Sequence, residues 1–154
     1  MDASWEACFS LLEKLGQTLD QLGGIEKEKT DAVRRDDLVK LDGCMKREQA
    51  VSMTLRTLEQ KRAALLPALG VPTDSTLSAL PGYCPPQLRP RARQTCETLM
   101  AKYGVYRSAA DVARMTLECS LHQVEKMMEA HYGAEKDAGG VLPGGRASFA
   151  DIRA

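Results

Sequence analysis

Two histidines and a scattering of carboxylates and thiols are the side chains of this sequence that could do chemistry. At about 100° per residue, His122 and His131 fall on opposite sides of a helix, so they cannot share a metal ion. The Glu-x-x-His pairs of dimetal helix-bundle enzymes are also missing, because Cys119 and Met128 occupy the positions three before the histidines. We therefore expect no catalytic residue, no metal site and no cofactor.

Two carboxylate pairs, Glu26 with Glu28 and Asp36 with Asp37, have the residue types of a general acid and base. Each pair lies in mixed-charge helical sequence that gives no sign of a pocket. We expect solvated helix faces and helix caps at these positions.

The cysteines form an odd set without any C-x-x-C pair, which argues against both a disulfide framework and a zinc site. They are Cys8, Cys44, Cys84, Cys96 and Cys119. Because four of them fall on or beside apolar helical positions, we expect reduced thiols that act as small core side chains.

The length and composition predict one domain with no net charge. The chain has 154 residues, with 21 basic and 21 acidic side chains, so no net field attracts it to nucleic acid or to anionic lipid. It starts without a secretion-signal pattern and has no apolar run near the roughly 18 residues that suggest a membrane span. The expected location is the cytoplasm, without membrane insertion.

Apolar residues spaced by three and four predict two long helices, at about 2–33 and 37–66. The first stripe is Trp5, Cys8, Leu12, Leu15, Leu19 and Leu22, and the second is Leu41, Cys44, Val51, Leu55, Leu58 and Leu65, interrupted at Glu48 and Arg62. The run Arg34–Asp37 predicts a tight turn between them, because cations suit a helix end and carboxylates suit a helix start. Helices joined so briefly must run antiparallel.

A proline-rich crossover at 67–90 precedes a third helix at about 87–132, and a glycine-rich tail at 134–154 is expected to be disordered. Gly104 could split this helix, but its stripe keeps phase, which favours a continuous helix. The predicted fold is all-α: an elongated antiparallel helical hairpin plus a third long helix, forming one domain over residues 1–133.

The third helix is rich in methionine, a flexible side chain that suits surfaces accepting imperfectly matched apolar partners. We expect Leu99, Tyr103 and Met115 in the core of the helical assembly. Nearer the C-terminus, where Met127 and Met128 put apolar side chains on more than one side, part of the helix is expected to face a partner.

The order of these features resembles the FlgN family of flagellar export chaperones, and the resemblance covers nearly the whole chain. It is carried by the leucine-rich first helix, the run Glu26–Leu41 leading into Lys46–Glu48, the break Leu65–Val71, the close at His131–Glu135, and the tail from Gly139–Gly140 to Phe149–Ala154.

The resemblance implies three helices and capture of hook-associated flagellar proteins by the C-terminal helix, for type III secretion through the export apparatus. Mapped onto this sequence, the implied partner-binding residues are Leu117, Leu121, Val124, Met127, Met128 and Tyr132. The alternative that the pattern leaves open is a structural coiled-coil protein whose stripes only form a homodimer or a larger bundle.

Overall fold

The computed structural model describes residues 2–137, and every regular element in that range is helical. In chain order these are α1 (Asp2–Arg34), α2 (Leu38–Leu65), the 3-10 turn η1 (Pro67–Leu69), the short α3 (Leu80–Tyr83) and α4 (Arg89–Asp137). The predicted all-α fold, a helical hairpin plus a third long helix, is confirmed.

The structure divides into two compact units, Met1–Ala113 and Arg114–Ala154. The first contains the hairpin, the crossover and the first half of α4. Of the second, the structure describes the remainder of α4.

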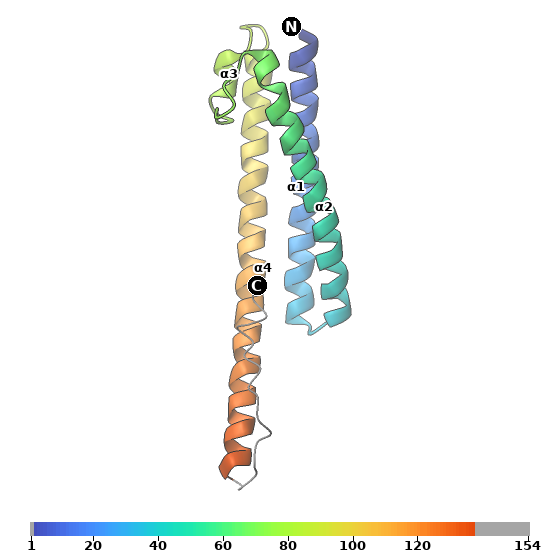
Figure 1. Cartoon of the computed structure of the whole chain (residues 1–154), viewed down its shortest axis with the longest axis vertical. Coiled ribbons are helices and arrows are strands. Elements are labelled where there is room, and N and C mark those ends of the chain that lie inside the picture. Colours follow the sequence, from blue (N-terminus) through green and yellow to red (C-terminus); the bar gives the residue numbers. More distant parts are fainter. Residues whose placement is uncertain (1, 138–154) are drawn as a thin grey trace. The chain divides into compact units, whose positions relative to one another are not determined.

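The turn between α1 and α2 forms where charged residues predicted it. Asp36 takes a left-handed backbone conformation with φ 55°, which Asp tolerates better than most residues. Asp37 then caps α2, its carboxylate accepting a hydrogen bond from the backbone N–H of Lys40 at 3.0 Å. This short connection lays α2 antiparallel beside α1 (Figure 1).

The main core lies around the first two thirds of α1. The whole predicted stripe of this helix, from Trp5 to Leu22, is buried, and Phe9 and Leu15 have no exposed surface. From α2 and its C-terminal end, Leu58 and Leu66 pack into the same cluster. Burial of each large apolar side chain contributes about 1.5–3 kcal/mol, which offsets the low helix propensity of the glycines in α1.

The crossover closes one end of this core. Gly70, with φ 71°, ends η1 in the left-handed conformation that glycine adopts without strain. Leu80 of α3 and Cys84 directly after it are buried in the main core. The crossover therefore covers the apolar end of the hairpin and leads the chain into α4.

The first turns of α4 complete the core against α1. Cys96 and Leu99 are buried in the main cluster. The guanidinium carbon of Arg91 lies 4.7 Å from the centre of the Phe9 ring, a cation–π contact. Farther along, Lys102 pairs with Asp20 of α1 at 2.7 Å.

The structure also settles how α4 runs. It is continuous through Gly104, as the phase of its stripe predicted, and it extends to Asp137, beyond the predicted end at 132. Met115 is 59% exposed, so the prediction that it fills the core is wrong. The rest of the predicted tail, residues 138–154, lies outside the described residues.

Candidate functional site

The residues predicted to bind a partner all lie on α4 beyond Ala113. Val124 is 41% exposed, Met127 71% and Tyr132 38%, and the other three are half-buried. Large apolar side chains rarely gather on an exposed helix face without a partner to cover them.

Helix geometry arranges most of these residues as one stripe. Steps of three and four place Leu117, Leu121, Val124, Met128 and Tyr132 within about 80° of arc around the α4 axis. We call these five residues the α4 stripe. Met127 lies beside this arc, whereas Met115 points to the opposite side.

A row of carboxylates borders the α4 stripe. Glu118, Glu125 and Glu129 fall within about 40° of one another along one edge of it. Between Leu117 and Tyr132 they are opposed by Lys126 alone. This part of α4 is therefore an acidic amphipathic helix.

The histidines stand apart from any site that could hold a metal. Both are exposed, and the ring of His131 lies 6.1 Å from that of Tyr132. Within residues 2–137, no three His, Cys, Asp or Glu side chains come together as metal ligands.

A buried polar cluster lies in the hairpin instead. Glu26 is only 3% exposed, which overturns the prediction that it faces solvent. Lys29 lies between two carboxylates, with its Nζ 3.3 Å from Glu26 and 2.6 Å from Glu48 of α2. The ammonium group of Lys29 thus pairs with two carboxylates at the interface between α1 and α2.

The environment of this cluster shifts its pKa values in ways that follow from burial and charge. Burial, which disfavours a charged carboxylate, raises the pKa of Glu26 against the lowering effect of Lys29. Burial alone would lower the pKa of Lys29, but its hydrogen bond to Glu48 and the charge of Glu26 outweigh this effect and raise it. The pKa of Tyr106 is raised by burial and by the nearby carboxylates.

The second interruption of the α2 stripe is paired as well. Arg62 forms an ion pair with Glu59 at 3.0 Å, and Glu59 accepts a hydrogen bond of 2.6 Å from the hydroxyl of Tyr103 on α4. Burial, together with this hydrogen bond, raises the pKa of Tyr103 well above its usual range. Of the two polar breaks in the sequence stripe, Glu48 contacts α1 directly through Lys29, whereas Arg62 holds Glu59, which makes the contact with α4.

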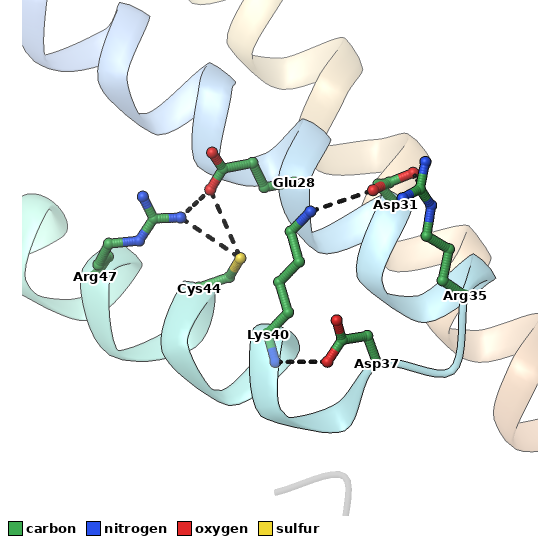
Figure 2. Close-up of polar contacts among 7 residues, drawn as sticks. All are labelled: Glu28, Asp31, Arg35, Asp37, Lys40, Cys44 and Arg47. Carbon is green, nitrogen blue, oxygen red and sulfur yellow. Dashed lines mark hydrogen bonds and ion pairs between the residues drawn. The ribbon is translucent and has the colours of Figure 1, made fainter.

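Near the turn, polar pairs join the two helices of the hairpin (Figure 2). Glu28 binds Arg47 and accepts a hydrogen bond from the thiol of Cys44 at 3.8 Å. Asp31 is held between Arg35 at 3.1 Å and Lys40 at 3.3 Å.

Four of the cysteines are buried, as expected for small core side chains, whereas Cys119 is exposed. Burial raises the pKa of Cys8 to about 11, and it also raises the pKa values of Cys84 and Cys96. Such thiols are protonated and unreactive at neutral pH.

An open groove of about 790 Å³ lies between α1 and α4 in the first unit. Its charged edge belongs to α1 and its floor to small and apolar residues of α4. It is lined by Lys27, Thr30, Asp31, Arg34, Ala101, Gly104, Val105, Ser108, Ala109 and Val112.

Sequence reasoning missed this groove. The available signal was a second run on α4, out of phase with the main stripe, in which small residues recur every three or four positions from Ala101. Such residues keep a helix face low, so that a neighbouring helix or another molecule can approach its backbone.

Comparison with known families decides the identity of the chain. The family model described as FlgN protein matches residues 1–140, nearly the whole sequence. The chain belongs to the FlgN family. No curated protein and no solved structure matches it.

FlgN proteins are flagellar export chaperones, so this FlgN chain belongs to a family that binds and escorts proteins and not to a family of enzymes. Among the described helices, none is long and apolar enough to cross a membrane. The family assignment gives the role but leaves open which surface of this chain performs it.

Proposed function

We propose that this protein is a cytoplasmic export chaperone that binds hook-associated flagellar proteins through the C-terminal part of α4. The exposure of Val124, Met127 and Tyr132 is the observation that carries this proposal. Together with the half-buried Leu117, Leu121 and Met128, these side chains give the segment an apolar face outside the main core, as a chaperone surface requires.

The contact is of the helix-in-groove kind, with an amphipathic segment at the end of the client packing its apolar face on the α4 stripe. Met127 and Met128 adapt to clients whose side chains differ, since methionine is unbranched and flexible. The covered client segment can no longer pack on other copies, so premature assembly is prevented.

Delivery to the export apparatus requires release, and this limits how tight the complex can be. A dissociation constant of about 0.1–10 μM corresponds to about 7–10 kcal/mol, which a few buried leucine and methionine side chains supply after ordering costs. No nucleotide or metal is needed for such an exchange.

The test is size-exclusion chromatography with light scattering, using the full chain mixed with C-terminal segments of hook-associated proteins. We expect a defined complex that is lost in Leu121→Asp and in Val124→Asp, each measured with circular dichroism to verify helicity. Met115→Asp is the matched control, because it puts the same charge on the opposite side of the same helix and should leave binding intact.

Equal loss of binding in all three variants would indicate that charge anywhere on α4 disrupts the complex, and the proposed face would be wrong. If the wild-type chain forms no complex and only self-associates, the structural coiled-coil alternative replaces the chaperone mechanism.

A further inference from the structure

The groove between α1 and α4 is not filled by the side chains that line it. The residues that α1 contributes are polar, namely Lys27, Thr30, Asp31 and Arg34. On α4, a Cβ atom added at Gly104 would meet nothing within 4 Å. The lining residues therefore leave the floor of the groove uncovered.

The floor carries two apolar side chains that are largely exposed. Val105 is 60% exposed and Val112 is 46% exposed. Because they are seven residues apart, they lie within about 20° of each other around α4 and about 10 Å apart along it. The small side chains of Ser108 and Ala109 between them keep the floor low. A neighbouring helix could therefore pack closely here, with apolar side chains two turns apart covering the two valines.

The edge of the groove is positive. Lys27 and Arg34 line it from α1, and no described residue forms an ion pair with either of them. The one acid on the same edge, Asp31, is already held by Arg35 and Lys40. The two cations are therefore available to carboxylates of another molecule.

The row of cations and the row of valines have the same repeat. Lys27 and Arg34 are also seven residues apart, or about 10 Å along α1. The two helices run in the same direction, since Glu6 pairs with Arg91 and Asp20 pairs with Lys102 farther along both (Figure 1). A helix with leucines spaced by three and four, and with glutamates every seventh residue along one edge, therefore matches both rows.

This groove does not share a face of α4 with the proposed client surface. Counted at 100° per residue, Val105 and Val112 lie about 150° around the helix axis from the centre of the α4 stripe. A helix seated in the groove therefore leaves the α4 stripe uncovered.

We propose that the groove is a second docking site, which binds an acidic amphipathic helix of a partner protein while a client occupies the α4 stripe. Glutamates along one edge of the partner helix face Lys27 and Arg34, and its leucines cover Val105 and Val112. Simultaneous binding of the two partners rests on the proposed function, whereas binding in the groove does not. The chaperone then joins its client to a second protein.

The first test uses a designed probe helix. It is a fluorescent peptide of about 18 residues, long enough to form a helix, with the leucine and glutamate pattern described above. A second peptide carries lysines in place of the glutamates. In fluorescence anisotropy with the full chain, which has no net charge, the glutamate peptide should bind at least about tenfold more tightly than the lysine peptide. No binding up to about 1 mM, or equal binding of both peptides, overturns the proposal.

The second test reverses the charge of the edge. Lys27→Glu/Arg34→Glu should prefer the lysine peptide, and the milder Lys27→Gln/Arg34→Gln should bind both peptides equally. Arg56→Glu/Lys61→Glu is the matched control, because it changes the net charge by the same amount at exposed positions of α2 and should keep the original preference. The proposal is wrong if both groove variants keep the preference, or if the control loses it as they do.

The third test removes the apolar floor. Val105→Ser/Val112→Ser should weaken the glutamate peptide about tenfold or more, with little change in helicity, because valine and serine have similar helix propensities. Leu38→Ser/Val39→Ser removes two apolar side chains of α2 that are 75% and 86% exposed, and it should leave binding unchanged. Equal effects of the two double variants would mean that the peptide does not rest on the valines, and they would overturn the proposal.

Two other occupants of the groove can be recognised in the same experiments. A second copy of the chain would appear in sedimentation equilibrium as a wild-type dimer that the glutamate peptide splits. Residues 138–154 of the same chain would appear as an affinity for the peptide that rises about tenfold when they are deleted. Either result overturns the proposal, which expects an unchanged monomer and an unchanged affinity.

The last test separates the groove from the client surface. Leu121→Asp should lose the client segments and bind the glutamate peptide like the wild type, whereas Val105→Ser/Val112→Ser should do the reverse. If client segments displace the peptide from the wild-type chain, the groove belongs to the client and the second site is wrong. If the wild type binds no client but passes the peptide tests, the groove site stands and the proposed chaperone surface fails.

Discussion

The two ends of the α1–α2 hairpin solve the same packing problem with different chemistry. Around Trp5 to Leu19, α1 meets α2, the crossover and α4 through a continuous apolar core. Toward the turn, the buried positions of α1 include Glu26 and Thr30, and the facing helix α2 contributes Glu48, which pairs with Lys29. Large apolar side chains close the helices tightly at the first end, whereas polar and small residues leave an open groove beside the second.

This difference separates two tasks. The apolar end supplies most of the stability, because burial of hydrocarbon is favourable at every contact. The polar end adds little net stability, since desolvation of Glu26 and Lys29 offsets most of their attraction. We expect it to add specificity instead, because a slipped hairpin would leave these charges buried without partners.

The largest effect is expected from a truncation at the apolar end. Leu15→Ala should lower the free energy of unfolding by about 3–4 kcal/mol, because Leu15 is fully buried and its removal leaves a cavity. Urea unfolding followed by circular dichroism measures this change. Val39→Ala is the control at the other end, where an 86% exposed side chain should matter by less than about 0.5 kcal/mol. Similar effects of the two truncations would contradict the comparison.

A charge deletion at the polar end should have the next largest effect. Lys29→Met leaves Glu26 and Glu48 facing each other without their shared cation, and we expect a loss of about 2 kcal/mol because the site is partly open to water. Lys14→Met, on the exposed face of the same helix, should change stability by less than about 0.5 kcal/mol. Equal values in urea unfolding would show that the buried pairs do not hold this end together.

The apolar end was predictable from sequence because its signal is repeated. Every step of three or four residues from Trp5 to Leu22 repeats the same helical spacing. The turn at Arg34–Asp37 has the residues that a helix end and a helix start require. Helix bounds were therefore right to within a few residues.

The polar end was not predicted, although part of its signal was present. Glu26 follows Leu22 by a step of four, so it occupies the next position of the buried stripe, and its charge alone led to the wrong expectation of solvent exposure. The groove could not be predicted, because it depends on which residues of α1 and α4 face each other across the interface. The α4 stripe as a client site remains a prediction.

A smaller effect at the polar end is expected from the titration of Glu26. Because burial raises its folded-state pKa above the ordinary value of 4.5, the folded chain holds this proton more tightly than the unfolded chain. The contribution of Glu26 to stability is fully present below pH 4.5, and it is lost as the pH rises through the folded-state pKa. Relative to Glu26→Gln, the wild-type protein should therefore gain stability as the pH falls from 7 toward 4. A difference that is constant or changes in the opposite sense would show that Glu26 is not desolvated.

The smallest perturbation is chemical labelling, which reports on both ends without changing the sequence. At pH 7, a colorimetric disulfide reagent should react quickly with Cys119 and slowly with the other four thiols, which are buried. Cys8, Cys84 and Cys96 are protected twice, by burial and by their raised pKa values, so at the apolar end only opening of the core exposes a reactive thiolate. Cys44 lies at the polar end beside Glu28 and Arg47. If that end opens more readily, Cys44 should be the second thiol to react, as mass spectrometry of partly labelled protein would show, whereas earlier labelling of Cys8 would reverse the order of stability inferred for the two ends.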